Sequence, residues 1–395
     1  MTQTDPIVIT GMARTPIGNF LGAFTGVPSP KLGADVIDAA LTRSGVAKDS
    51  VDEVIMGCCL PAGLGQAPAR QASLGAGLEQ STACVTINKM CGSGMKALMQ
   101  GVESLLAGTN EVIVAGGMES MTNAPHLLPS GRTGIKYGAG RVVDHMAMDG
   151  LEDAYEPGKA MGVFAEKCAR EWQFSREEQD AYSIRSVERA KHAIANGQFK
   201  DEITPITVKT RKGDLEIVDD EKPGLVDPAK IPNLRAAFEK DGSVTAGNAS
   251  AISDGAAALV AMRASTAERS GAHAIARIVA MSTHAQAPEW FTTAPVASIT
   301  KLLERCGWST ADVDLWEINE AFSVVPLAAM REHKLPDEKV NIHGGAIALG
   351  HPIGASGARI ICTLMNALRQ TGGKKGVASL CIGGGEATSL AVELL

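Results

Sequence analysis

The sequence predicts an α/β fold in which one unit of helices and strands occurs twice, with a segment of different character inserted between the copies. Internal similarity is the first observation: residues 36–57 parallel residues 298–319, and matching positions lie 262 apart (299 − 37). The matching pairs are Ile37/Ile299, Leu41/Leu303, Arg43/Arg305, Gly45/Gly307, Val51/Val313 and Asp52/Asp314. The second observation is that short β-branched runs alternate with longer helical patterns, which is typical of sheets covered by helices.

A further stretch repeats in almost the same register. Ser93 and Gly94 recur as Ser356 and Gly357, which lie 263 positions later (356 − 93). In both copies the pair opens a helical pattern, and a strand of small residues and a glycine cluster follow. Strands are expected at residues 7–9, 54–56, 112–114 and 376–381, where β-branched residues gather.

The segment between the copies, residues 122–250, begins with prolines, glycines, methionines and histidines that indicate irregular loop. A helix follows, with Ser175 as its N-cap, Glu178 completing a capping box and Gly197 at its end. Residues 209–214 and 219–222 are expected to be solvated hairpin loops. An insertion of this kind often covers an active site or forms an oligomer contact.

We therefore divide the chain into three parts. Residues 1–121, completed by about 251–274, form the first half, residues 122–250 form an inserted loop domain that covers the substrate, and residues 275–395 form the second half.

Composition excludes several classes of protein. The net charge of −7 and the pI near 5.7 argue against a surface dedicated to nucleic acid or to an anionic membrane. No apolar stretch approaches the ~18 residues of a membrane span. The chain has eight cysteines but no C-x-x-C pair, so free thiols in a reducing compartment are expected. Without a secretory or transit pattern at the start, a cytoplasmic protein is the expectation.

Cys91 is the first candidate for chemistry. It ends a strand-like run and is followed by Gly-Ser-Gly and a helical pattern. The free N–H groups and the dipole at a helix N-terminus favour a thiolate, which makes this residue a candidate nucleophile. The residues alone leave open the alternative of a packed core cysteine.

Three further segments carry candidate residues. His351 stands between Gly350 and Pro352 on a rigid turn, and a structural histidine is the alternative. Cys381 ends a strand and precedes three glycines whose N–H groups can form an anion-binding nest. Asn319 interrupts an apolar run where a strand changes to a helix, a position that a helix cap also explains.

These four segments, in this order, together with residues 244–259 (VTAGNAS, then DGAAAL), resemble the thiolase family over essentially the whole chain. The resemblance implies the layering of the duplicated fold: two similar, helix-covered mixed sheets in a five-layer αβαβα arrangement, plus the inserted loop domain.

The resemblance also implies roles for single residues. Cys91 is similar to the family's nucleophile, which accepts an acyl group as a thioester. His351 is similar to the base that activates it and that, with a water held by Asn319, polarises the thioester oxygen of the incoming acetyl-CoA. Cys381 is similar to the residue that takes a proton from the acetyl methyl and returns one to the leaving group. The N–H groups of Cys91 and Gly383 resemble an oxyanion hole for the tetrahedral intermediate.

Other positions resemble the family's substrate tunnel. Ser250 is similar to a residue that contacts the pantetheine, and Met161, Phe238 and Phe322 are similar to the tunnel walls. Ordinary core packing is the alternative explanation for these three apolar side chains.

Residues 14–22, 65–77, 86–97 and 316–325 resemble the short-chain branch of the family. The implied reaction is the reversible condensation of two acetyl-CoA to acetoacetyl-CoA and CoA, with no cofactor and no metal, in a homodimer or homotetramer. One departure concerns the acyl pocket, because Ala160 stands where the family often has histidine. Another is Lys222, followed by Pro223 and Gly224, in a loop where some short-chain members have a tyrosine near a potassium ion.

Three alternatives remain at this point. A thiolase with broader 3-ketoacyl-CoA specificity differs only in the length of the acyl chain that it accepts. A β-ketoacyl synthase would use an acyl carrier protein and lacks the second catalytic cysteine, so Cys381 argues against it. A non-catalytic binding or scaffold protein with this fold would not need Cys91, His351, Cys381 and Asn319. G-x-S-x-G, Walker A and strict G-x-G-x-x-G patterns are absent, which removes the basis for a serine hydrolase, P-loop NTPase or Rossmann dehydrogenase.

Overall fold

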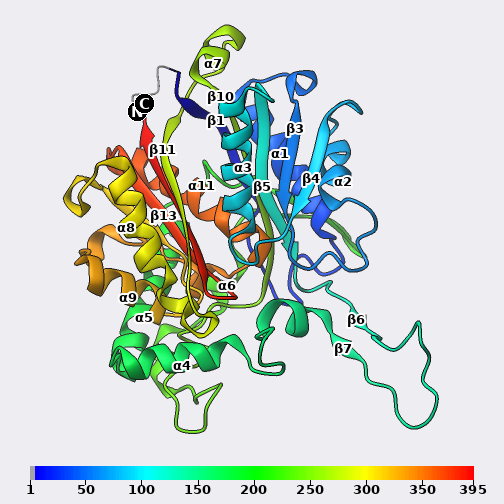
Figure 1. The fold of residues 1–395 in the computed structure, drawn as a ribbon, viewed down its shortest axis with the longest axis vertical. Helices are drawn as coiled ribbons and strands as arrows, with labels where there is room; N and C mark the ends of the chain where they lie inside the picture. Colours follow the sequence, from blue (N-terminus) through cyan, green and yellow to red (C-terminus); the bar gives the residue numbers. More distant parts are fainter. Residues whose placement is uncertain (1–4) are drawn as a thin grey trace.

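The first half of the molecule forms a five-stranded part of a mixed sheet, seen on the right of Figure 1. The computed structural model describes residues 5–395. The strands of this half follow the order β4-β3-β5-β10-β1, and short β2 (Gly18–Asn19) pairs with β10. Its elements are β1 (Ile7–Arg14), α1 (Ser29–Ser44), β3 (Glu53–Gly57), α2 (Pro68–Gly75), β4 (Ala83–Ile87), α3 (Ser93–Ala107), β5 (Val112–Ser120), β10 (Ser253–Arg263) and α7 (Ala264–Ser270).

The second half repeats this arrangement, with strand order β12-β13-β14-β11. In both halves one parallel pair (β3 with β5, β12 with β13) is followed by two antiparallel pairs. The prediction of a duplicated α/β fold is thus confirmed. The elements are β11 (Ala276–Ala285), α8 (Ala294–Cys306), β12 (Leu315–Ile318), α9 (Val324–His333), α10 (Ala346–Leu349), α11 (Ile353–Thr371), β13 (Lys375–Ile382) and β14 (Glu386–Leu394).

Residues that recur in the sequence make equivalent hydrogen bonds or helix ends in both halves. Asp52 accepts hydrogen bonds from the N–H groups of Glu111 and Val112 at 2.7 and 2.9 Å. Its counterpart Asp314 accepts from the N–H groups of Lys374 and Lys375, where β13 begins, at 2.8 and 2.9 Å. The glycines after α1 and α8 both end their helices in the left-handed conformation, with φ of 69° and 67°. The repeated sequence is therefore the signal for repeated strand and helix ends.

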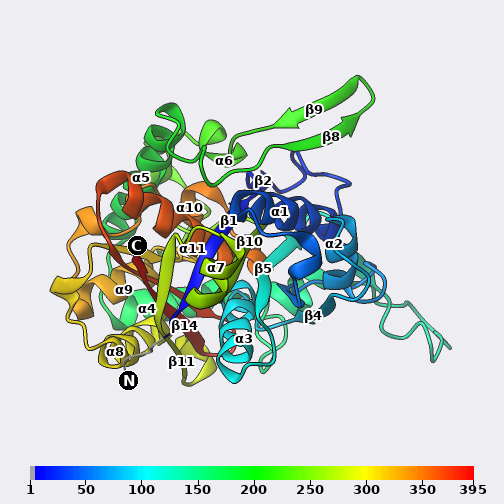
Figure 2. The same cartoon turned by 90° about the horizontal axis from the view of Figure 1, so that it is seen from above.

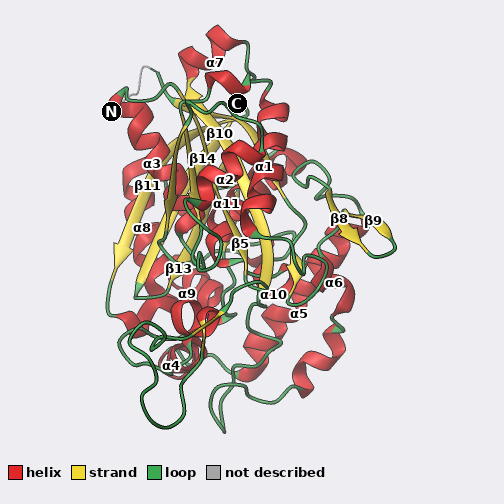
Figure 3. Cartoon of the chain, turned by 90° about the vertical axis from the view of Figure 1, so that its right-hand side faces the viewer, coloured by secondary structure: helices red, strands yellow, loops and turns green. Residues whose placement is uncertain are grey.

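The five expected layers are present. Helices α3 and α11 lie together in the centre, packed between the two halves of the sheet, while α1 and α2 cover one outer face and α8 covers the other. The halves meet edge to edge through β1 and β11, so that one continuous sheet of ten strands results. Figure 3 shows these strands framed by helices.

The central helices approach each other at two glycines. A Cβ added to Gly357 would lie 2.4 Å from the backbone nitrogen of Met95, and one added to Gly94 would lie 2.8 Å from that of Ala358. Only glycine permits this crossing, because any side chain would push the two backbones apart. The crossing brings the starts of α3 and α11, which follow Cys91 and His351, to the same region.

The insertion lies below the two halves in Figure 1. Ser175 and Glu178 form the expected capping box at the start of α5, and that helix stops at Ala195 with Gly197 following at φ 67°. The β6–β7 loop projects away from the body in Figure 1 and the β8–β9 hairpin in Figure 2. The elements are β6 (His126–Leu127), β7 (Val143–Asp144), α4 (Met161–Glu171), α5 (Arg176–Ala195), β8 (Ile206–Thr210), β9 (Gly213–Ile217) and α6 (Glu221–Leu225).

One loop prediction is wrong. Residues 209–214 do form an exposed hairpin turn, but 219–222 run into α6 and carry buried charges. Asp220 is 3 % exposed and forms a two-point ion pair with Arg14 at 2.7 and 2.9 Å. The buried guanidinium of Arg14 at the end of β1 requires a carboxylate partner. The sequence around residues 219–222 does not show that one of these charged residues supplies it.

The division of the chain into three parts stays a prediction, although β10, which follows the insertion, lies between β1 and β5 as that division expects. Within residues 5–395, no helix combines the length and the hydropathy that crossing a membrane requires.

Candidate active site

Cys91 lies on a tight turn between β4 and α3. Met90, just before it, has φ 46°, and a Cβ on Gly92 would come within 2.3 Å of Ile382 Cδ1. Lys89 at the same turn forms an ion pair with Glu386. The turn is thereby fixed against the β13–β14 hairpin of the other half, and the two halves of the duplication share one site.

The thiol of Cys91 differs from the sequence expectation. Burial raises its pKa to about 11, and hydrogen bonds from the N–H groups of Gly383 and of Cys91 itself oppose this shift without cancelling it. The helix start favours a thiolate, as expected from the sequence, but desolvation outweighs it and raises the pKa of the thiol. The structure nevertheless places both predicted backbone donors at the sulfur.

This shift predicts the pH dependence of alkylation. A thiol with raised pKa has a small thiolate fraction at neutral pH, and that fraction rises about tenfold per pH unit below the pKa. We expect the rate of Cys91 modification by iodoacetamide, followed by peptide mass spectrometry, to keep rising through pH 9.5. A plateau between pH 6 and 8 would show that the thiolate is already formed in the resting protein.

Cys381 ends β13 and is fully buried. Burial raises its pKa well above the usual value, and the neighbouring Cys91 raises it further. Burial therefore favours the protonated form of both thiols, and a charge on Cys91 would disfavour ionisation of Cys381 further. Gly383, two residues on, belongs to the turn that leads into β14.

His351 precedes α11 and is 6 % exposed. Its Nδ1 lies 2.6 Å from Ser356 Oγ, and its Nε2 lies 3.5 Å from Asn319 Nδ2. Burial lowers the pKa of His351 to about 3, with Arg359 adding to the effect, so the ring is neutral at working pH. A neutral imidazole can accept a proton, which is what a general base requires.

A buried network holds the turn that carries His351. Glu320, next to Asn319, accepts a hydrogen bond from Ile347 N–H at 3.1 Å, and Lys222 Nζ donates to Ile347 O at 2.6 Å. Burial lowers the pKa of Lys222 to about 8, while Glu320 raises it. The insertion thus reaches the active-site turn through Lys222.

One predicted tunnel residue lies next to Gly383. A Cβ on Gly383 would lie 3.6 Å from Met161 Cε, which places the Met161 side chain beside the β13–β14 turn. The rings of Phe238 and Phe322 meet edge to face at 6.0 Å, and Ser250 N–H donates to Ala321 O at 3.0 Å. Met161, Phe238 and Phe322 also belong to one hydrophobic core cluster, so each of them can both pack in the core and form part of the tunnel wall.

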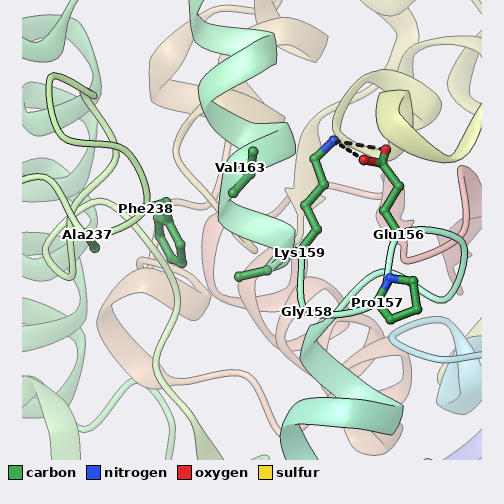
Figure 4. Close-up of a pocket in the computed structure, with 8 residues that line it drawn as sticks. Glu156, Pro157, Gly158, Lys159, Val163, Ala237 and Phe238 are labelled. Carbon is green, nitrogen blue, oxygen red and sulfur yellow. Dashed lines mark hydrogen bonds and ion pairs between the residues drawn. The ribbon is translucent and has the colours of Figure 1, made fainter.

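An open depression borders these residues (Figure 4). Its volume is about 580 Å³, and it is lined by Glu156, Pro157, Gly158, Lys159, Ala160, Val163, Ala237 and Phe238. Lys159 and Glu156 pair at its rim, with Nζ–Oε1 at 2.9 Å. Phe238 packs against α4 at Gly162, where a Cβ would lie 2.3 Å from the ring. Ala160 therefore stands at the edge of a space open to solvent.

Sequence reasoning missed Glu119. Its carboxylate accepts from the N–H groups of Cys59, Leu60 and Gly354 at 2.8, 3.2 and 2.9 Å, which ties the first half to the start of α11. The signal that could have identified it is a charged residue near the end of β5, a strand whose residues are all buried. Among residues 5–395, no group of three His, Cys, Asp or Glu side chains is arranged to hold a metal ion.

Comparisons with known proteins identify the family of the chain. The family models for the thiolase N-terminal and C-terminal domains match residues 7–265 and 272–394. Acetyl-CoA acetyltransferase 1 of Arabidopsis thaliana is 50 % identical, with 100 % of this chain and 95 % of that protein covered. Acetyl-CoA acetyltransferase of Schizosaccharomyces pombe is 46 % identical, with 100 % of both chains covered.

Solved structures also match over nearly the whole chain. The crystal structure of the Bacillus anthracis acetyl-CoA acetyltransferase superposes with a TM-score of 0.96 at 41 % identity, covering 99 % of both chains. Acat5 thiolase from Ascaris suum, in complex with coenzyme A, superposes with a TM-score of 0.93 at 40 % identity, covering 99 % of this chain and 100 % of that one. The chain belongs to the thiolase family.

Proposed function

We propose that this chain is an acyltransferase, an acetyl-CoA C-acetyltransferase, which condenses two acetyl-CoA to acetoacetyl-CoA and CoA and catalyses the reverse thiolysis. The observations that carry the proposal are the proximity of Cys91 to the Cys381 thiol and to the N–H of Gly383, and the neutral imidazole of His351 at the start of α11, the helix that crosses α3. One thiol serves as nucleophile and leaving group, and the other serves as acid and base.

In the first half-reaction, Cys91 sulfur attacks the thioester carbon of acetyl-CoA while its proton moves to His351 Nε2. The N–H groups of Cys91 and Gly383 stabilise the tetrahedral oxyanion. The C–S bond to CoA breaks, the CoA sulfur takes the proton of Cys381, and Cys91 keeps the acetyl group.

In the second half-reaction, the Cys381 thiolate removes a methyl proton from a second acetyl-CoA. Protonated His351, with a water held by Asn319, stabilises the enolate oxygen. The carbanion attacks acetyl-Cys91, a C–C bond forms, and the Cys91 sulfur leaves and recovers its proton from His351. All protons are returned, so no redox partner is needed. We propose that no cofactor takes part, and unchanged activity after dialysis against EDTA is the expected result.

Substrate length tests the short-chain assignment against broader 3-ketoacyl-CoA specificity. We expect acetoacetyl-CoA to be thiolysed best, because one alanine at position 160 is not enough to remodel walls made of Met161, Phe238 and Phe322. Each buried methylene is worth about 0.8 kcal/mol where room exists, or about fourfold in kcat/KM. We expect kcat/KM to fall sharply beyond four carbons. Efficient thiolysis of 3-ketohexanoyl-CoA or 3-ketooctanoyl-CoA would instead establish the broader enzyme, and an Ala160→His variant would then restore the short-chain preference.

We propose that the chain forms a homodimer or a homotetramer. Strand β4 is an edge of the sheet, with Val85 37 % exposed, and an unpaired edge favours pairing with another chain. The projecting β6–β7 loop exposes Leu128, Ile135 and Tyr137, which suits a second contact. Light scattering during size-exclusion chromatography distinguishes these states, and a monomer at micromolar concentration would refute both.

We propose a cytoplasmic location. The eight cysteines are all free, which suits a reducing compartment. Cell fractionation followed by an activity assay tests it, and recovery of the activity in an organelle fraction would refute it.

A further inference from the structure

The role given to His351 above requires a lone pair on Nε2, and the environment of the ring explains what keeps the proton on the other nitrogen. A neutral imidazole has one N–H and one lone pair, and only the nitrogen with the lone pair can accept the proton of Cys91. Both ring nitrogens have neighbours within the protein. Their chemistry determines the tautomer.

Ser356 lies against Nδ1. Its hydroxyl is fully buried in the first turns of α11, with Oγ 2.6 Å from His351 Nδ1 and 3.0 Å from the carbonyl oxygen of Pro352. The hydroxyl of Ser356 has a single proton, which it donates either to Pro352 O, four residues earlier in the chain, or to His351 Nδ1. The first arrangement leaves the Ser356 oxygen as an acceptor toward His351, which requires a proton on Nδ1.

Asn319 lies against Nε2 and favours the same tautomer. Its amide nitrogen, 3.5 Å from Nε2, is a donor only. A proton on Nε2 would place two donors face to face. A proton at Nδ1 and a lone pair at Nε2 therefore satisfy the contacts of both neighbours of the ring together.

The internal duplication supplies an independent observation. Ser93, the counterpart of Ser356, is also fully buried near the start of a helix. Its Oγ accepts from Lys89 N–H at 2.8 Å and donates to Met90 O at 2.6 Å, which closes the turn that carries Cys91. In each copy the serine holds the segment before its helix, and in one copy that segment carries the nucleophile while in the other it carries the histidine.

We propose that Ser356 is a positioning residue that sets the tautomer of His351, so that the Nε2 lone pair faces the substrate side. The proposal rests on the proposed role of His351 as base. The proposal gives a specific role to Ser356, which would otherwise be explained as a small residue that packs between helices.

The direct test is the ¹⁵N spectrum of protein labelled at the histidine rings. The chain has eight histidines, and the difference from a His351→Asn sample identifies the signals of interest. We expect a protonated Nδ1 and an unprotonated Nε2 in the wild type, and a mixture of tautomers in Ser356→Ala. A protonated Nε2 in the wild type, or an unchanged tautomer in Ser356→Ala, would overturn the proposal.

Kinetics provide a second measurement. We expect Ser356→Ala to lower kcat for thiolysis about 10- to 100-fold, with KM for acetoacetyl-CoA within about twofold, because the base is disoriented while the binding surface is kept. Ser356→Cys, which keeps the volume but accepts hydrogen bonds weakly, should lie between Ala and wild type. It also substitutes for Ser356→Ala in both measurements if the alanine variant does not fold.

Ser298→Ala is the matched control. Ser298 is a fully buried serine of α8, and its hydroxyl forms hydrogen bonds with the hydroxyls of Ser282 and Ser389. It should leave kcat and the His351 signals unchanged, and an equal loss of kcat in this control would reduce Ser356 to a packing residue. If the wild type itself lacks thiolysis, the proposed function fails, whereas the ¹⁵N spectrum still decides the role of Ser356.

Discussion

Replacing Cys91 by serine is expected to abolish acetyl transfer, with a loss in kcat of about 10³- to 10⁴-fold or more. The hydroxyl oxygen is a much poorer nucleophile than sulfur at neutral pH, and its ester would be a poorer acyl donor than a thioester. His351 and the N–H of Gly383 would remain in place, so binding of acetyl-CoA should change little. The measurement is steady-state thiolysis of acetoacetyl-CoA together with a binding assay for CoA.

Mass spectrometry identifies the acylated atom in the same experiment. After brief incubation with acetyl-CoA, digestion should yield an acetyl group on the Cys91 peptide of the wild type and none on that of Cys91→Ser. Cys306→Ser, at a half-buried free cysteine at the end of α8, is the control that should label normally. An acetyl group found only on Cys381 would assign the nucleophile to the other thiol.

Replacing Cys381 by alanine is expected to separate the two half-reactions. Cys91 and its backbone donors are untouched, so the variant should still become acetylated, although more slowly because the leaving CoA loses its acid. Removal of the base should lower exchange of the methyl protons of acetyl-CoA with D₂O by about 10²- to 10⁴-fold, and condensation with it. Exchange is followed by NMR of the methyl signal.

Cys362→Ala is the control for this variant, because Cys362 is an equally buried thiol in α11. It removes the same atom from the core and should exchange protons at the wild-type rate. If Cys381→Ala exchanges as fast as the wild type, another group is the base, and the assignment of Cys381 is wrong.

Local sequence was sufficient for the duplicated elements. Asp52 and Asp314, or Gly45 and Gly307, recur because each strand start and helix end needs the same hydrogen bonds or the same left-handed turn. The capping box of Ser175 and Glu178 is likewise complete within four residues. Such features depend on neighbours in the chain, so the repeated pattern predicts them.

Buried charge could not be predicted in this way. Residues 219–222 are polar and were expected in solvent, yet Asp220 pairs with Arg14, 206 positions away in the chain, and Lys222 reaches Ile347. The same holds for Cys91, where a favourable helix start predicts a thiolate but burial raises the pKa instead. Desolvation depends on everything that packs around a group, and a local motif does not contain that information.

The sequence by itself determined the duplication, the α/β class, the family resemblance and the identity of the candidate residues, because these follow from local patterns and from long motifs. The tertiary structure alone decided how the two copies combine. The crossing of α3 and α11 at Gly94 and Gly357 brings Cys91 from one copy to the turn of Gly383 from the other. It also decided the states of the groups, since the contact between Asn319 and His351, 32 positions apart, and the exclusion of water from both thiols exist only once the layers have packed.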